Sequence, residues 1–175
     1  MAVPFTPQEI VEIYWAAAGT VVDFDAMTET EAQSLVRVTD FLQQGLPSPA
    51  GSQFADAGTL ASGFQAQVAS VYGGGSGDFN VIRKRDPQSP GSDAADIAFA
   101  LFARRTVGTF VVFPYGVSDT TDPSDPLPEE GDVYTAYPVE VGNRGEPIAR
   151  GELMIGVISI AFNGVPHELK RVVAA

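Results

Sequence analysis

The sequence predicts a mostly β domain of the α+β class, on three observations. Hydrophobic residues make up 45% of the 175 residues and charged residues only 18%, which is enough apolar surface for one domain with a core. The 18 Gly and 13 Pro favour strands joined by turns and loops over a helix bundle. The second half of the chain holds three strong strand-like runs, "TFVVFPYG", "DVYTAYPVEVGNRG" and "IARGELMIGVISIAFNG".

The first residues carry the signals of a helix. In "FTPQEIVEIYWAAAG", Thr6 is a suitable N-cap, Pro7 suits the first helical position, and Glu9 completes a capping box. Gly19 provides a stop. The alternative is an extended arm that becomes ordered only against a neighbouring molecule. We therefore expect an N-terminal helix or arm at residues 1–18, followed by a single β domain at residues 19–175.

The stretch from Thr28 to Gly45 fits two structures. Leu35, Val38 and Leu42 fall on one helical face, and Thr28 with Glu31 forms a second possible capping box. The segment "LVRVTDF" is nevertheless rich in β-branched residues and alternates partly at period two, which favours a strand. Local signals leave this choice open.

The middle of the chain predicts a loop, two strands and a helix. "LPSPAGSQFADAG" is typical of a loop, "FQAQVASV" alternates like a strand, and "DFNVIRKRD" is a second β run after the glycine-rich turn at 73–77. Because a strand follows that turn, it does not predict a phosphate-binding loop. Residues 92–105, "SDAADIAFALFARR", predict a packed α-helix with acids at its start and Arg104 and Arg105 at its end. Gly151 and Gly156 predict a bend or bulge in the last long strand.

Composition excludes several classes of function. With 22 acids against 10 bases, the net charge of −12 opposes nucleic-acid binding through phosphate contacts. The absence of cysteine excludes disulfides and thiol chemistry, and the single histidine, His167, is expected on the surface at a strand end. We predict no catalytic, cofactor or metal site. No apolar run reaches the roughly 20 residues that cross a bilayer, and no signal peptide is evident, so we expect no membrane association and synthesis in the cytoplasm.

Two charged segments call for an explanation. The loop "VSDTTDPSDPLPEEGD" at residues 117–132 has carboxylates for a calcium site, but it lacks the spacing of an EF-hand. The basic run Arg83, Lys84 and Arg85 is typical of a solvated strand or an ion-pair site between subunits.

The order of the segments resembles the major tail tube proteins of long-tailed phages, which share a fold with the tube protein of type VI secretion. The similarity runs from about Gly19 onward. It rests on the order of "SLVRVTDF", a Pro/Gly loop, "DAGTLASGF", "DFNVIRKRD", "DAADIAFALFA", "TFVVFPYG", "YTAYPVEVGN" and "ARGELMIGVISIAFNGVP". In that family "SLVRVTDF" is a strand, so the resemblance favours a strand at this ambiguous position.

The resemblance implies a structural, non-enzymatic subunit of a bacteriophage virion. Such subunits form hexameric rings whose sheets join into a barrel around a lumen, with the helix outside and long loops reaching between stacked rings. The implied partners are other copies of the chain and the tape measure, terminator and initiator proteins. DNA would pass through the lumen without specific binding, and the tail would be assembled in the host bacterial cytoplasm. A ring stacked head to tail grows into a filament.

Loops at two places are the expected contacts between subunits. We expect the Gln44–Ala57 loop to reach a neighbour. The acidic loop would either be a contact stiffened by its prolines or an outer segment that keeps the tube soluble. The contact residues predicted in these loops are Leu46, Pro47, Pro49, Phe54, Pro123, Pro126, Pro128 and Glu129. Gly151, Gly156 and Ser159 do not alternate cleanly along the last strand, so the sequence does not assign the face that lines the lumen.

Two alternatives remain from the sequence. One is another virion component, such as a tail terminator, a head–tail joining protein or a capsid decoration protein. The other is a small acidic module that binds a metal or a sugar.

Overall fold

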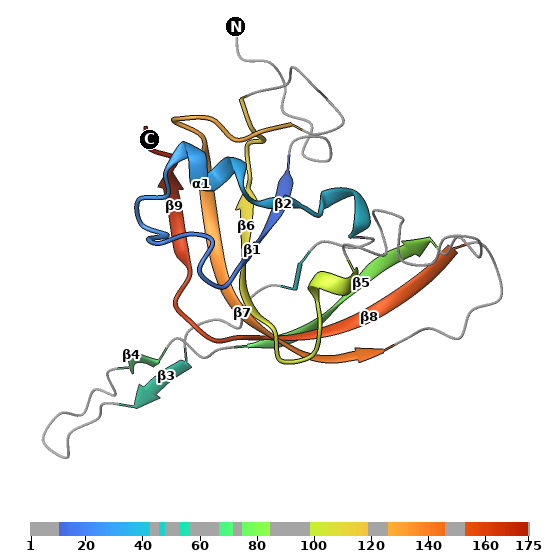
Figure 1. Cartoon of the computed structure of the whole chain (residues 1–175). Helices are drawn as coiled ribbons and strands as arrows, with labels where there is room; N and C mark the ends of the chain where they lie inside the picture. Colours follow the sequence, from blue (N-terminus) through green and yellow to red (C-terminus); the bar gives the residue numbers. More distant parts are fainter. Residues whose placement is uncertain are drawn as a thin grey trace, which may run out of the picture.

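The computed structural model describes residues 11–42, 46–47, 53–56, 67–71, 75–84, 99–118, 126–145 and 153–174. Within this part of the chain most residues form antiparallel strands, which confirms the mostly β prediction (Figure 1). The main sheet has the order β2-β1-β6-β7-β8-β5, and β9 pairs with β7 beside this path. Its strands are β1 (Glu12–Ala17), β2 (Val36–Arg37), β5 (Ser76–Lys84), β6 (Val107–Phe113), β7 (Val133–Gly145), β8 (Leu153–Phe162) and β9 (His167–Arg171).

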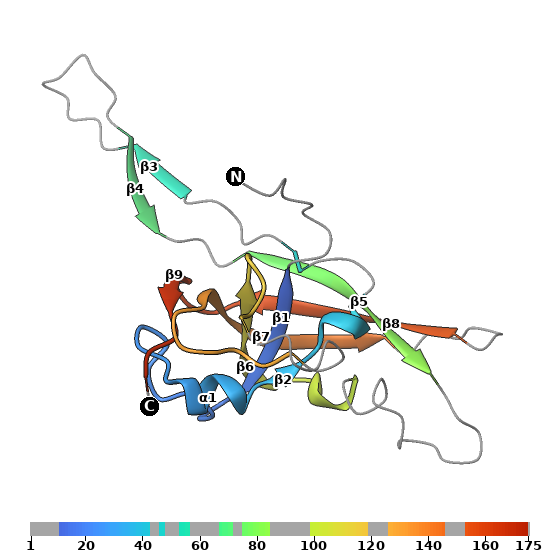
Figure 2. The same cartoon turned by 90° about the horizontal axis from the view of Figure 1, so that it is seen from above.

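A second, two-stranded sheet consists of β3 (Gln53–Asp56) and β4 (Gln67–Val71). Figure 2 shows this pair set apart from the main sheet. Strand β4 confirms the strand predicted around Val68. The loop predicted across residues 46–58 is wrong at Gln53–Asp56, because these residues find hydrogen-bonding partners in β4, more than ten residues further along the chain.

Strand β1 overturns the predicted N-terminal helix at Glu12–Ala17. It pairs with β6 along its whole length, from Glu12 opposite Phe113 to Ala17 opposite Gly108. Four consecutive residues, 13–16, are buried, and alternate side chains enter different cores on the two faces of the strand. A surface helix would bury only one stripe, so burial on both faces selects the strand. The capping signals at Thr6 and Glu9 lie outside the described residues, and the division of the chain at residue 18 stays a prediction.

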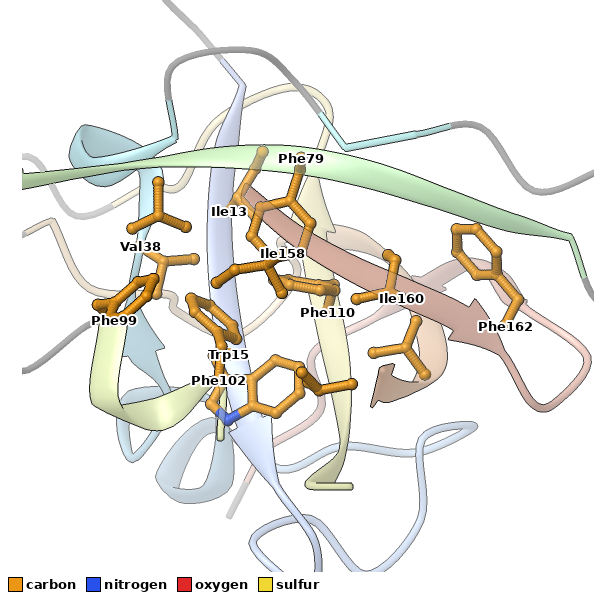
Figure 3. Close-up of a cluster of buried hydrophobic side chains, with 13 residues drawn as sticks. Ile13, Trp15, Val38, Phe79, Phe99, Phe102, Phe110, Ile158, Ile160 and Phe162 are labelled. Carbon is orange, nitrogen blue, oxygen red and sulfur yellow. The ribbon is translucent and has the colours of Figure 1, made fainter. Parts of the chain in front are cut away.

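The sheet separates two hydrophobic cores. The first core gathers large side chains of the main sheet with Phe99 and Phe102, and Figure 3 shows Trp15, Phe102 and Phe110 packed among side chains of β5 and β8. The ring centroids of Trp15 and Phe102 lie 5.2 Å apart in an edge-to-face arrangement. The second core lies on the other face of β1, β6 and β7, under the segment that contains α1 (Glu29–Gln33). The strands β1 and β6 are therefore covered on both faces, apart from the exposed Val107 where β6 begins and Ala17 where β1 ends.

The ambiguous stretch from Thr28 to Gly45 resolves into three short elements. Helix α1 has the predicted capping box, in which Thr28 and Glu31 exchange hydrogen bonds. The pKa of Glu31 is lowered because the backbone N–H groups of Thr28 and Val22 donate to its carboxylate. The helix stops at Gln33, followed by strand β2 and a 3₁₀ turn at Thr39–Phe41. A helix that continues through Leu42 is therefore wrong, and so is a strand over all of "SLVRVTDF". Only Val36 and Arg37, which form β2, are in a strand as that prediction had it.

The chain is tied to β1 at the end of this stretch. Val38 donates its N–H to the carbonyl of Ile13 at 2.9 Å, and Ile13 donates its N–H to the hydroxyl of Thr39 at 2.8 Å. Arg37 also holds both carboxylate oxygens of Glu12, with Nε at 2.7 Å and Nη2 at 3.1 Å. These long-range bonds explain why local helical periodicity does not decide the structure here.

The helix predicted at residues 92–105 is described only from Phe99. Residues 99–101 are helical, Phe99 and Phe102 are buried in the first core, and Arg104 and Arg105 are exposed beyond the helical residues. Leu101 packs against the same core, as predicted, whereas Ile97 lies outside the described residues. The described end of the segment therefore packs against the sheet.

The irregularity predicted at Gly156 lies in the neighbouring strand instead. Strands β5 and β8 keep a continuous register past the Val81–Gly156 pair, whereas β7 shifts register against β8 between Val141 and Arg144. A side chain at Gly156 would collide with the ring of Phe99, so glycine at this position makes room for a core side chain. Gly151 lies outside the described residues.

Candidate functional site

In one region of the sheet, one face packs against a hydrophobic core, and none of the described residues covers the other face. In β5, Phe79 and Val81 are buried, whereas Ser76 and Asp78 are exposed. In β8, Ile158, Ile160 and Phe162 are buried, whereas Val157 and Ala161 are exposed. This period-two pattern places alternate side chains on opposite faces. β5, β7 and β8 also extend beyond β1 and β6 (Figures 1 and 2).

The register joins the exposed side chains into rows across four strands. Val107 of β6 lies opposite Glu140 of β7, which lies opposite Ala161 of β8, which lies opposite Ser76 of β5. The next rows pair Asp78 with Ser159 and Asn80 with Val157. Directly paired residues share one face of a sheet. We call this surface the open face, and it consists of Ser76, Asp78, Asn80, Val107, Glu140, Val157, Ser159 and Ala161.

The open face is small, polar and negatively charged. It contains the carboxylates of Asp78 and Glu140 and neither Lys nor Arg, and its two valines are only partly exposed, Val107 by 46% and Val157 by 43%. Arg144, on β7, lies opposite the buried Ile158 and directs its guanidinium over the ring of Phe99 at 4.5 Å, on the side of the first core. The eight residues that make up the open face thus include no cation with which to hold a phosphate backbone, and the same alternation continues along β5 to Lys84, whose side chain lies outside the described part.

The described residues give no sign of metal chemistry. Among them, no three His, Asp or Glu side chains come together in a way that could hold an ion. Every buried side-chain N or O atom in that part of the chain has a hydrogen-bond partner. None of the described helices is long and apolar enough to cross a membrane.

The contact residues predicted in the first loop are spread over different environments. Leu46 packs against the first core, and Pro47 lies so close to Gly77 that a side chain there would collide with it. Phe54 belongs to β3, and Pro49 lies outside the described residues. A contact between subunits at these positions stays a prediction.

The acidic loop is anchored to the body at both ends of its described part. Pro126 and Pro128 are buried, and the carbonyl of Pro126 accepts a hydrogen bond from the hydroxyl of Tyr14. Glu129 is exposed, whereas Pro123 is not among the described residues. A contact between subunits at these residues also stays a prediction. Pro126 and Pro128, however, are already buried within their own protomer.

Asp132 is a structural residue that the sequence did not reveal. It is buried, and its carboxylate accepts hydrogen bonds from the N–H of Ser118 at 3.0 Å, the N–H of Glu129 at 2.9 Å and the Ser118 hydroxyl. It therefore closes the base of the acidic loop. In the sequence it is one acid among many, and only its position directly before a strand distinguishes it.

The basic run and the histidine are located as follows. Arg83 and Lys84 are the last residues of β5, paired with Met154 and Leu153 of β8, and Arg85 lies outside the described residues. Their role as an ion-pair strand stays a prediction. His167 begins β9 and is partly exposed, as expected for a surface histidine at a strand end.

His167 also belongs to a small polar cluster. Its Nδ1 lies 2.9 Å from Oδ1 of Asp25, and the Nζ of Lys170 lies 2.9 Å from the same oxygen. The pKa of Asp25 is lowered, first by the hydrogen bond with His167 and then by that with Lys170. The cluster ties the loop before α1 to β9.

A comparison with protein-family models gives the identity of the fold. A model described as "Phage tail tube protein" matches residues 2–175, almost the whole chain. None of the curated proteins matches the chain. The match includes the segments whose order suggested the resemblance, together with the N-terminal segment that precedes them. The chain therefore belongs to the phage tail tube protein family, and it is a structural component of a phage tail.

Proposed function

We propose that copies of this tail tube protein close into hexameric rings, that the rings stack into a tube, and that the open face lines the channel. DNA passes this surface during ejection without being bound. The chain acts as a building block and performs no catalysis. Its further partners are the tape measure, terminator and initiator proteins, with assembly in the cytoplasm of the host bacterium.

The observation that carries this proposal is the contrast between the two halves of the sheet. Strands β1 and β6 are covered on both faces by the two cores, so they offer little surface to a channel. The side chains of the open face on β5, β7 and β8 are mostly small and polar. Its two charged residues, Asp78 and Glu140, are both acids. Double-stranded DNA carries about one negative charge per 1.7 Å of its axis, so these carboxylates repel it. DNA is not held by a surface of this kind and can therefore slide along it.

The edges of the sheet support closure into a ring. β5 ends the sheet on one side and β2 on the other, and unpaired edges tend to join other strands. The described contact on the outer edge of β5 is a single bridge between Val81 and Leu42. Pairing between copies would complete these edges and turn six open sheets into one barrel.

The test places a cation on the open face and asks whether DNA is retained inside the tube. Subunits are assembled in the presence of short double-stranded DNA, tubes are purified, and DNA protected from nuclease is measured. Glu140→Lys should trap protected DNA at low salt, and adding Asp78→Lys should trap more, because each cation attracts phosphate. Unmodified tubes should hold little.

Glu168→Lys is the matched control, because Glu168 is an exposed strand glutamate of β9 and lies outside the open face. This variant should protect no more DNA than the unmodified tube. Equal protection by Glu140→Lys and Glu168→Lys would show that the open face does not line the channel. Electron microscopy of the same samples tests the tube itself, and a protein that forms neither rings nor tubes at any concentration would contradict the proposal as a whole.

A further inference from the structure

The turn between β8 and β9 contains the adjacent residues Asn163 and Gly164. Asn163 is exposed and directly follows the last residue of β8. Its N–H donates to the carbonyl of Pro138 in β7 at 3.1 Å, which fixes the start of the turn. Within the part of the chain that the structure describes, neither the side-chain amide of Asn163 nor the N–H of Gly164 makes a hydrogen bond. The two groups are therefore available to react with each other.

The two other asparagines of the chain provide an internal comparison. Asn80 lies within β5 and precedes Val81. Asn143 lies within β7 and precedes Arg144, and it is exposed like Asn163, so exposure alone does not distinguish them. The difference is in the next residue, because a side chain there shields the backbone nitrogen and glycine has none. Both strands are also paired with β8, which holds their backbone extended.

These features of Asn163 and Gly164 are the ones that deamidation of asparagine requires. The backbone nitrogen of Gly164 loses its proton to the solvent and attacks Cγ of the Asn163 side chain. A new N–C bond closes a succinimide ring, the bond between Cγ and the side-chain nitrogen breaks, and ammonia leaves with a proton taken from water. Water then opens the ring at either carbonyl, which gives aspartate or isoaspartate. The net reaction consumes water, releases ammonia and replaces an amide by a carboxylate.

We propose that Asn163 is a modification site at which the chain deamidates spontaneously. Asparagine is among the residue types that limit the thermal lifetime of proteins. The inference does not depend on the proposed assembly, because it uses only a turn within one protomer. The packing also gives a reason for the glycine, since a Cβ at Gly164 would lie 3.1 Å from both Cβ and Cγ of Pro138, closer than an ordinary contact. The reactive pair is therefore favoured by the fold itself.

Deamidation at this turn changes the connection between two strands that share one neighbour. Phe162 of β8 lies opposite Val139 of β7. His167 of β9 lies opposite Ala136 of the same strand, so residues 163–166 connect β8 to β9 along one edge of β7. An isoaspartate routes the backbone through the side-chain carbons and lengthens this short connection. An extra backbone link disturbs the pairing beside it, as a bulge does, so the modification should weaken the pairing of β9 with β7.

The test follows the full chain during storage. Purified protein is kept in mildly alkaline buffer made with water enriched in heavy oxygen, and peptide mass spectrometry locates each asparagine that has been converted. Asn163 should become a mixture of aspartate and isoaspartate, whereas Asn80 and Asn143 should remain amides over the same period. The conversion should be slower in mildly acidic buffer, because the attacking nitrogen must lose its proton. Conversion of Asn143 as fast as that of Asn163, or full retention of the Asn163 amide, would overturn the proposal.

Asn163→Gln is the matched variant, because it keeps a side-chain amide but places it a carbon further from the backbone nitrogen of Gly164. The unmodified chain should accumulate an acidic species on ion-exchange chromatography, and this variant should lose it. An acidic species that accumulates equally in Asn163→Gln would overturn Asn163 as its source.

Asn163→Asp separates the added charge from the altered backbone. This variant carries the new carboxylate on an ordinary backbone, whereas the stored chain also contains isoaspartate. The stored chain should therefore have a lower Tm than Asn163→Asp, and freshly purified protein should have a higher Tm than the stored chain. Equal Tm values for the stored chain and Asn163→Asp would overturn the expected weakening of the connection between β8 and β9.

Discussion

Leu169 combines a left-handed backbone with an exposed apolar side chain. Its φ is 49°, and the residue is 63% exposed on β9. It lies where β9 shifts register against β7, between the pairs at Tyr134 and Ala136, and its N–H donates to the Thr135 hydroxyl at 3.3 Å. A left-handed conformation costs a non-glycine residue about 1–2 kcal/mol. The bulge therefore strains the backbone at Leu169. Because the side chain is mostly exposed, its burial offsets little of that cost.

We expect Leu169→Gly to be more stable than Leu169→Ala by about 1 kcal/mol. Both variants remove the exposed side chain, but only glycine adopts this φ without steric cost. Urea unfolding of the two variants at equal protein concentration measures the difference. An alanine variant as stable as the glycine variant would mean that the bulge relaxes to an ordinary backbone conformation.

At the scale of the element, Gly108 leaves room for the ring of Trp15, a residue of β1, to lie over the neighbouring strand β6 on the side of the first core. A Cβ at this position would collide with the Trp15 ring and lie 2.7 Å from the carbonyl oxygen of Ala16. Trp15 is 1% exposed and also touches Phe102 and Phe110 in the first core, so it has no free space to move into. The packing of Trp15 against β6 therefore requires a residue without a side chain at position 108.

We expect Gly108→Ala to destabilise the protomer by about 2–3 kcal/mol through overpacking. Gly142→Ala is the control, because a Cβ there would meet its nearest atom, the carbonyl oxygen of Ser159, at an ordinary 3.4 Å. Thermal or urea unfolding of both variants gives the comparison. Similar losses in the two would show that the β1–β6 pair can shift to accommodate a methyl group.

At the scale of the whole molecule, salt should stabilise the folded protomer. A net charge of −12 destabilises a folded chain by self-repulsion, and salt screens that repulsion. The free energy of unfolding of the protomer should therefore increase with ionic strength.

We expect the Tm of the monomeric protomer to rise by a few degrees when NaCl is raised from about 20 mM to about 200 mM. Calorimetry at a protein concentration below that needed for assembly gives the Tm. A neutral osmolyte such as sucrose is the control, since it does not screen charge. A Tm that falls with NaCl would show that favourable ion pairs outweigh self-repulsion within the protomer.

Features whose causes are local follow from the amino-acid sequence alone. The capping box of Thr28 and Glu31 needs residues three apart, and it forms as predicted. The strands β5 to β8 follow from long β-branched and aromatic runs bounded by turns, and these runs in their order also indicated the family. In each case the deciding contacts are between near neighbours or depend on the apolar content of a segment.

Features that depend on partners distant in the chain could be recognised only in the folded molecule. The sequence predicted a helix, with an extended arm as the alternative, at the four buried residues 13–16, and only pairing with β6 makes them part of β1. Asp132 becomes an anchor because the fold brings Ser118 to it. The open face could not be read from β8 alone, because Gly156 belongs to the core side and Ser159 to the other. Which face is covered depends on long-range packing, and that is a property of the folded sheet rather than of any single strand.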